Sequence, residues 1–166
     1  MNIVLIGYRG TGKSTVGRQL AARLGRTLVS TDTEIVKRAQ RTIPEIVAQE
    51  GWEYFRDLES EICREISSRD QLVIDTGGGA ILRAQNVEAL KKNGTVFWLT
   101  ASVETIAKRI GGDNQRPSLT GTKSFVDEIQ DVLRERTPKY QAAADHIIVT
   151  DGRSTNQLME IILGLV

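Results

Sequence analysis

Cysteine and histidine are nearly absent from this chain, which has one of each in 166 residues. Cys63 alone cannot form an internal disulfide or a cysteine-based metal cluster. Its neighbours Leu58 and Ile62 lie at helical spacing, which predicts a buried small side chain and not a reactive thiol. His146 opens a strand-like run and has no cysteine partners, so we expect a strand-edge residue without a chemical role.

The sequence also lacks an excess of charge of either sign and any long apolar run. Lys plus Arg number 22 and Asp plus Glu number 21, so the net charge is +1 and no overall field attracts nucleic acid or a membrane. No stretch approaches the roughly 18 apolar residues of a membrane span, and the first residues carry no signal-peptide pattern. We therefore expect a cytoplasmic protein, monomeric by default, with no nucleic-acid or membrane partner.

The most informative segment that is present is a complete Walker A loop, Gly7-Tyr8-Arg9-Gly10-Thr11-Gly12-Lys13-Ser14. An apolar run precedes it and helical spacing follows it, as the motif requires. Glycines let backbone N–H groups approach and face a phosphate, and the following helix adds its positive N-terminal end. Lys13 is placed to reach the β- and γ-phosphates, and Ser14 to bind Mg²⁺. An ordinary glycine-rich turn is the alternative; the motif predicts a nucleotide site made of Gly10, Thr11, Gly12, Lys13, Ser14 and Thr15.

Strand-like and helical runs alternate along the chain, which is typical of βαβ units. A length of 166 residues with 40% hydrophobic and 26% charged residues fits one globular domain, residues 1–166. Five parallel strands with right-handed crossovers predict a three-layer α/β/α fold. The predicted strands are 2–6, 27–30, 72–75, 96–99 and 146–149, and the predicted helices are 13–25, 33–40, 43–49, 53–69, 83–92, 103–110, 125–143 and 155–163.

Two stretches depart from the βαβ rhythm. Between the second and third predicted strands lie some forty mainly helical residues, against the dozen or so that a crossover needs. This insertion is long enough for a subdomain that binds a second substrate, and we assign it to residues 33–60. The other stretch, 111–123, is rich in glycine and polar residues and lies between two predicted helices, so we expect a mobile lid.

Two carboxylates and a glycine run follow predicted strands, at the edge where open α/β sheets bind ligands. Asp32 is either a helix N-cap or a catalytic residue. Asp75 ends the apolar strand 72–75, as in a Walker B element that holds Mg²⁺ through water. The run Gly77-Gly78-Gly79 comes next, and it either turns backbone amides toward a ligand or forms a plain turn.

Three arginines complete the candidates, Arg56, Arg116 and Arg136; singly, each could equally be a solvated surface charge. Together the motifs resemble the shikimate kinase family in order and spacing, across essentially the whole chain. The resemblance rests on the Walker A loop, Asp32, Phe55-Arg56, the triple glycine, Arg116-Pro117, and Arg136 before Pro138-Lys139-Tyr140. It implies a P-loop kinase fold that uses Mg²⁺ and transfers the γ-phosphoryl group of ATP to the 3-hydroxyl of shikimate.

The same resemblance implies a role for each site residue. Asp32 contacts the acceptor hydroxyl and orients or deprotonates it, and Lys13 and Arg116 act on the transferring phosphate. A pair of arginines grips the shikimate carboxylate, which guanidinium groups bind bidentately. The acceptor residues implied are Asp32, Arg56, Gly78, Gly79 and Arg136, and those implied for ATP beyond the Walker loop are Arg109, Arg116 and Arg153.

Two positions depart from the family pattern. The family usually has an aspartate near the Mg²⁺ water shell where this chain has Ser30, and small or hydroxyl residues are common where it has Asp75. Our hypothesis is that the carboxylate has moved from one strand to its neighbour across the same metal site, so that Ser14 and Asp75 share the ion. Trp52 stands where relatives commonly carry glutamate.

Other functions remain open from the sequence. A gluconate kinase or a nucleoside monophosphate kinase has the same fold, although a nucleotide acceptor would call for more phosphate-binding arginines. A nucleotide-dependent switch or an inactive binding module is the alternative outside enzymes. Inactive copies usually lose the lysine, the acceptor carboxylate or the lid arginine, and this chain keeps all three, Lys13, Asp32 and Arg116.

Overall fold

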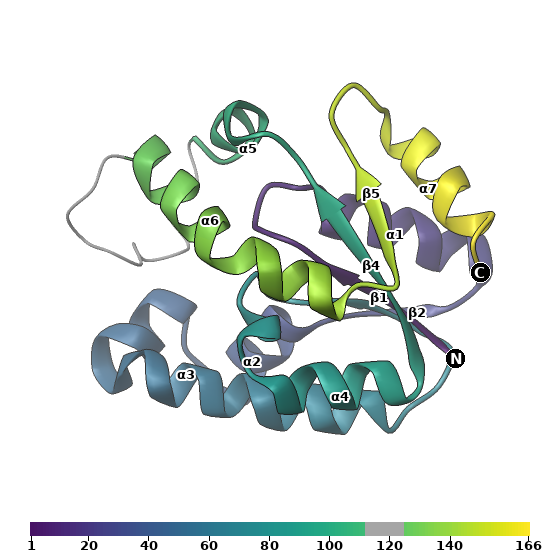
Figure 1. Cartoon of the computed structure of the whole chain (residues 1–166). Helices are drawn as coiled ribbons and strands as arrows, with labels where there is room; N and C mark the ends of the chain where they lie inside the picture. Colours follow the sequence, from purple (N-terminus) through teal and green to yellow (C-terminus); the bar gives the residue numbers. More distant parts are fainter. Residues whose placement is uncertain (112–124) are drawn as a thin grey trace.

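The computed structural model describes residues 1–111 and 125–166. Its sheet has five parallel strands in the order β2-β3-β1-β4-β5, which confirms the predicted sheet (Figure 1). The strands are β1 (Asn2–Ile6), β2 (Thr27–Ser30), β3 (Leu72–Asp75), β4 (Gly94–Thr100) and β5 (His146–Val149). The helices are α1 (Lys13–Leu24), α2 (Thr31–Ala39), α3 (Ile43–Ser67), α4 (Ala84–Lys92), α5 (Val103–Ile110), α6 (Phe125–Ala143) and α7 (Thr155–Leu163), with a 3-10 turn, η1, at Ala80–Leu82.

Alternating side chains along β1 divide the hydrophobic core between the two faces of the sheet. Ile3 and Leu5 pack with α1 and α7 on one face, and Val4 and Ile6 pack with α2, α3, α4 and α6 on the other (Figure 1). All four side chains are buried, as expected for a parallel strand covered on both faces. This arrangement confirms the three-layer α/β/α fold.

Two element boundaries differ from prediction in ways that affect the site. Helix α2 begins at Thr31, two residues early, because the Ser30 hydroxyl accepts a hydrogen bond from the Thr33 N–H at 3.2 Å. Ser30 is therefore the N-cap, and the alternative that Asp32 caps this helix is wrong.

The predicted helices 43–49 and 53–69 are one element, α3, interrupted at Gly51. Glycine adopts the local φ of +86° at no steric cost, so the chain changes direction without a separate loop.

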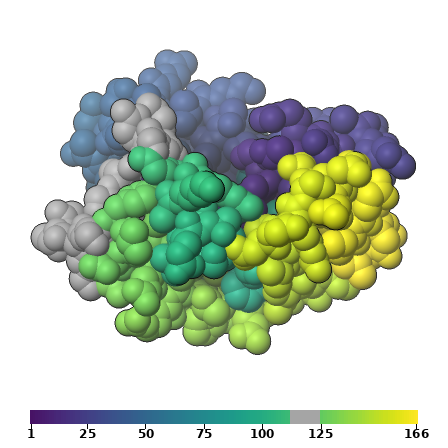
Figure 2. All heavy atoms as spheres, turned by 90° about the horizontal axis from the view of Figure 1, so that it is seen from above, coloured from purple at the N-terminus to yellow at the C-terminus, as the bar shows by residue number. Residues whose placement is uncertain are grey.

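The carboxyl ends of β1, β2 and β3 meet at one edge of the sheet, which positions the motifs that follow these strands. Seen from above, the N-terminal segment with the Walker loop (purple) lies between the segment of α2 and α3 (blue) and the C-terminal segment (yellow) (Figure 2). The predicted lid, apart from Gly111, lies outside the described residues. Among residues 1–111 and 125–166, no helix is long and apolar enough to cross a membrane.

Candidate active site

The Walker A loop wraps tightly between β1 and α1. At Gly7, with φ of +144°, a Cβ atom would lie 2.4 Å from the Leu99 carbonyl oxygen, and at Gly10, with φ of +81°, it would lie 2.5 Å from an Ile110 methyl carbon. Only glycine fits either position without displacing a neighbour. The Lys13 amine reaches back over the loop and donates to the Gly7 and Tyr8 carbonyl oxygens, at 2.8 and 3.0 Å. The loop and its lysine thus form a preorganised anion cradle.

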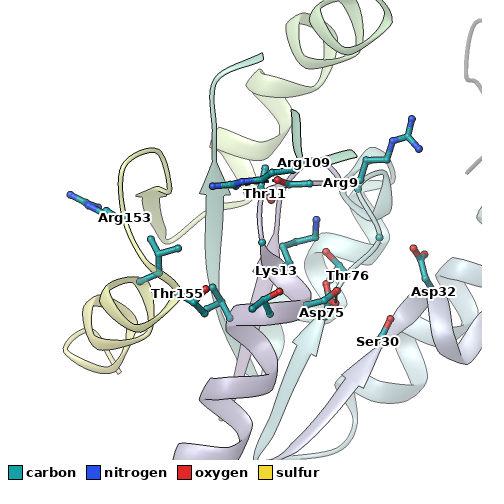
Figure 3. A pocket seen from close by; sticks show the side chains of 18 of the residues that line it. Arg9, Thr11, Lys13, Ser30, Asp32, Asp75, Thr76, Arg109, Arg153 and Thr155 are labelled. Carbon is teal, nitrogen blue, oxygen red and sulfur yellow. Dashed lines mark hydrogen bonds between the residues drawn. The ribbon is translucent and has the colours of Figure 1, made fainter. Parts of the chain in front are cut away.

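A cavity of about 640 Å³ opens in front of this loop and joins it to the other candidate residues (Figure 3). Asp32 lies across it from Lys13, on the first turn of α2, and Asp75 lies at the end of β3. The volume is in the range of pockets that hold nucleotide-sized ligands. The predicted residues that line it are Gly10, Thr11, Gly12, Lys13, Ser14, Thr15, Asp32, Asp75, Gly78, Arg109 and Arg153.

The predicted metal pair is in direct contact. The Ser14 hydroxyl donates to a carboxylate oxygen of Asp75 at 2.6 Å. Asp75 is also the parallel partner of Ser30 in the β2–β3 register, so the two positions compared in the sequence lie side by side. A hydroxyl and a carboxylate are hard oxygen ligands that suit Mg²⁺, which takes one or two protein carboxylates together with substrate phosphates. The residues present therefore fit a Mg²⁺ ion.

Arg56 is held from several sides at the far end of the glycine run. It donates to Glu59 at 2.8 Å, and Glu59 is fully buried. Its guanidinium lies 5.3 Å from the ring centre of Trp52 and 5.2 Å from that of Phe55, within cation–π range. Trp52, which stands where relatives commonly carry glutamate, thus packs its ring against this arginine. A Cβ atom on Gly79 would lie 2.4 Å from the guanidinium, so the arginine rests against the bare glycine backbone.

Arg136 approaches the same turn from α6. Its side chain is buried, and a Cβ atom on Gly78 would lie 3.5 Å from one of its terminal nitrogens. Gly78 and Gly79 thus lie against Arg136 and Arg56, which the sequence separates by eighty positions. Two guanidinium groups with one buried carboxylate, Glu59, leave a net positive charge among these three side chains, which suits a small anion.

The charges of two acceptor-side carboxylates, Asp32 and Glu59, act on the buried Cys63 thiol. Burial, together with the negative charges of Glu59 and Asp32, raises the pKa of this thiol to about 12. Cys63 is a free, buried cysteine, which confirms the small core residue predicted from its spacing.

At the other end of the cavity, two arginines flank the path from the Walker loop to β5. Arg109 on α5 donates to the Gly10 carbonyl oxygen at 3.1 Å and to the Thr150 hydroxyl at 3.3 Å. Arg153 donates to the Val149 carbonyl oxygen at 3.2 Å and is exposed. Both line the cavity on the side away from Asp32 (Figure 3). Arg116 lies outside the described residues.

Sequence reasoning missed the residues that hold the glycine run in place. The Thr31 hydroxyl accepts from the Gly77 N–H at 2.8 Å, and the Thr76 hydroxyl donates to the Leu5 carbonyl oxygen at 2.9 Å. Tyr140 donates to the Gly78 carbonyl oxygen. The position of Tyr140 could have been predicted from its spacing, because it follows Arg136 by four residues and so shares its helix face. No comparable spacing in the sequence points to Thr31 or Thr76.

A parallel sheet in this order, a Walker A cradle and a hydroxyl–carboxylate pair beside its lysine define a P-loop kinase. The family model for shikimate kinase matches residues 9–166. The chain belongs to the shikimate kinase family.

Relatives in both sequence and structure agree with this placement. The shikimate kinase of Nitratidesulfovibrio vulgaris is 46% identical over 152 residues, which cover 90% of this chain and 86% of the relative. That of Syntrophus aciditrophicus is 43% identical, over 98% of this chain and 89% of the relative. The structure of shikimate kinase from Acinetobacter baumannii in complex with shikimate superposes with a TM-score of 0.94 at 40% identity, covering 99% of this chain and 91% of that one.

Proposed function

We propose that this enzyme transfers the γ-phosphoryl group of ATP to the 3-hydroxyl of shikimate, with donor and acceptor meeting in the 640 Å³ cavity. The observation that carries the proposal is the geometry of the glycine run. Gly78 and Gly79 lie against two arginines on one side, and Gly78 lines the Walker-loop cavity on the other. A carboxylate held by these arginines places the rest of a small acceptor toward Asp32 and the phosphates.

On the donor side, Lys13 and the backbone N–H groups of the Walker loop would bind the β- and γ-phosphates. Ser14 and Asp75 would hold a Mg²⁺ ion, which when bound neutralises phosphate charge. Arg109 and Arg153 would flank the nucleotide base at the other end of the cavity, where both line its wall. Arg116 would reach the transferring phosphate from the lid, residues 111–123.

On the acceptor side, Arg56 and Arg136 would grip the carboxylate, with backbone contacts from Gly78 and Gly79. Asp32 would contact the 3-hydroxyl and orient it for in-line attack. Its position supports this role, since it lines the cavity across from Lys13. Phosphoryl transfer depends mostly on positioning and charge neutralisation, so a carboxylate that orients the hydroxyl can suffice without early proton removal.

The wider organisation follows from the same assignment. Residues 33–60 would form the acceptor subdomain, because α2 carries Asp32 in its first turn and the part of α3 within this range carries Arg56. We further propose that the enzyme works as a monomer in the cytoplasm, where ATP is available. One chain supplies both the Walker cradle and the arginine pair, so no second copy is needed to complete these two sites.

The decisive measurement is ADP formation from MgATP with and without shikimate. We expect turnover that depends on shikimate and is absent with gluconate or nucleoside monophosphates. Turnover with one of those acceptors, and none with shikimate, would overturn the proposal.

Three variants then test the roles. Asp32→Asn should lower kcat by orders of magnitude with little change in shikimate binding, whereas Arg136→Ala should mainly raise the KM for shikimate. Arg134→Ala is the matched control, because Arg134 lies on the same helix with an exposed side chain paired to Asp131. Equal losses in Arg136→Ala and Arg134→Ala would refute the carboxylate site.

A further inference from the structure

The Tyr140 hydroxyl lies at a junction between the two groups that form the anion subsite. It donates a hydrogen bond to the carbonyl oxygen of Gly78, the glycine whose Cβ position would lie 3.5 Å from an Arg136 guanidinium nitrogen. Arg136 and Tyr140 come from one face of α6, and Gly78 comes from the turn after β3, 62 residues from the tyrosine. A single oxygen atom therefore connects the helix to the glycine turn.

The tyrosine ring is fixed, so the position of its oxygen is fixed too. Tyr140 is fully buried and stacks on Trp98 of β4, with ring centres 5.5 Å apart and planes 21° apart. Burial raises the pKa of Tyr140 to about 12, although the neighbouring Arg136 lowers it. The hydroxyl keeps its proton at neutral pH and directs it at the Gly78 carbonyl oxygen, which leaves its lone pairs available to a neighbouring cation such as Arg136.

The glycine turn leaves little room for adjustment if this oxygen is removed. A Cβ atom on Gly78 would lie 3.5 Å from a guanidinium nitrogen of Arg136. It would lie 3.6 Å from the Arg9 backbone nitrogen and from the Gly7 carbonyl oxygen. Gly78 thus lies between the arginine and the Walker loop. A shift of its peptide changes the distance between the anion subsite and the phosphate cradle.

We propose that Tyr140 is a positioning residue, which sets the Arg136 guanidinium and the Gly78 peptide in the relative geometry that a carboxylate-bearing acceptor needs. The inference rests on the proposed role of Arg136 in binding that carboxylate. Without the hydroxyl, the buried Gly78 carbonyl oxygen loses its donor, and the peptide against which the Arg136 guanidinium lies is free to shift. The acceptor is then bound more weakly and out of line.

Tyr140→Phe removes this oxygen and keeps the ring stacked on Trp98. We expect the KM for shikimate to rise about tenfold and the KM for ATP to change by less than about twofold. The rise should be the same across neutral pH, because the hydroxyl does not titrate there. Tyr54→Phe is the control, since it makes the same change at an exposed tyrosine on α3.

A double variant separates positioning from general loosening of the core. If Tyr140 acts through Arg136, the shikimate KM of Tyr140→Phe/Arg136→Ala should lie within about threefold of that of Arg136→Ala alone. If the two single changes multiply fully in the shikimate KM of the double variant, or if Tyr140→Phe also raises the KM for ATP, Tyr140 has only a structural role. If Arg136→Ala raises the shikimate KM and Tyr140→Phe leaves it unchanged, the inference fails and the proposed function stands. If Arg136→Ala itself leaves the KM unchanged, the carboxylate site is wrong.

A measurement on the unmodified enzyme covers the case in which Tyr140→Phe does not fold. The chain has 3 tyrosines, so ring-labelled enzyme gives three ¹³Cζ signals, two of which are assigned with Tyr8→Phe and Tyr54→Phe. Shikimate should shift the remaining signal, that of Tyr140, because Arg136 turns part of its charge toward the carboxylate. An unshifted signal at saturating shikimate would overturn the inference.

Discussion

At the scale of single residues, the pair Ser30 and Asp75 offers the sharpest test of the metal site. The two are parallel partners on neighbouring strands, and Asp75 accepts from the Ser14 hydroxyl at 2.6 Å. Asp75→Ala should raise the Mg²⁺ concentration needed for half-maximal turnover by about tenfold or more, with the shikimate KM unchanged. A titration of activity against Mg²⁺ at fixed ATP measures this.

The compensating variant is the control for that experiment. Ser30→Asp/Asp75→Ala returns a carboxylate to the neighbouring strand and keeps the net charge, so it should recover most of the Mg²⁺ response. Asp is also a good N-cap, so α2 should keep its first turn. Unchanged Mg²⁺ dependence in Asp75→Ala would show that the ion is held elsewhere, and no recovery in the double variant would show that the carboxylate cannot be exchanged between the two strands.

At the scale of elements, the turn between β3 and η1 fixes how close Arg56 comes to the site. Gly79 has an ordinary φ of −101°, so alanine fits the backbone there, but its Cβ would lie 2.4 Å from the guanidinium. Gly79→Ala should therefore displace Arg56 and raise the shikimate KM by about tenfold, with little change for ATP. Gly164→Ala at the end of α7 is the matched control, because its Cβ would lie 3.5 Å from the nearest atom. Equal kinetics in the two variants would show that Arg56 adapts without loss.

The elements also show what a sequence can and cannot predict. The five strands and the Walker loop depend on local pattern, and the structure has all of them, four strands with the predicted bounds and β4 longer, at Gly94–Thr100 against the predicted 96–99. The sequence left open whether Asp32 caps α2; Ser30 is an equally good capping residue, and only the backbone geometry shows that it is the N-cap. The contacts of Gly79 with Arg56 and of Tyr140 with Gly78 join distant segments, and no local pattern encodes such a distance.

At the scale of the whole molecule, the proposed donor and acceptor subsites share one support, the glycine turn. The Gly77 N–H donates a hydrogen bond to the Thr31 hydroxyl of α2, and Gly78 lies against both the Walker loop and Arg136. A ligand in either subsite binds only the folded chain, so each should stabilise the entire domain by linkage. At about one hundred times its Kd, a ligand adds about 2.7 kcal/mol, which raises the Tm of a domain of this size by roughly 5–10 °C.

Thermal unfolding with each ligand separately should therefore distinguish the subsites. Shikimate alone and MgADP alone should each raise the Tm of the parent enzyme. Arg136→Ala should lose most of the shikimate shift and keep the MgADP shift, whereas Lys13→Ala should show the reverse. The comparison uses shifts and not absolute Tm values, because Lys13 also bonds the Gly7 and Tyr8 carbonyl oxygens and its loss lowers the unliganded Tm. Arg134→Ala should keep both shifts. A shikimate shift that survives in Arg136→Ala would place the acceptor carboxylate away from this arginine, and the glycine turn would then support the donor alone.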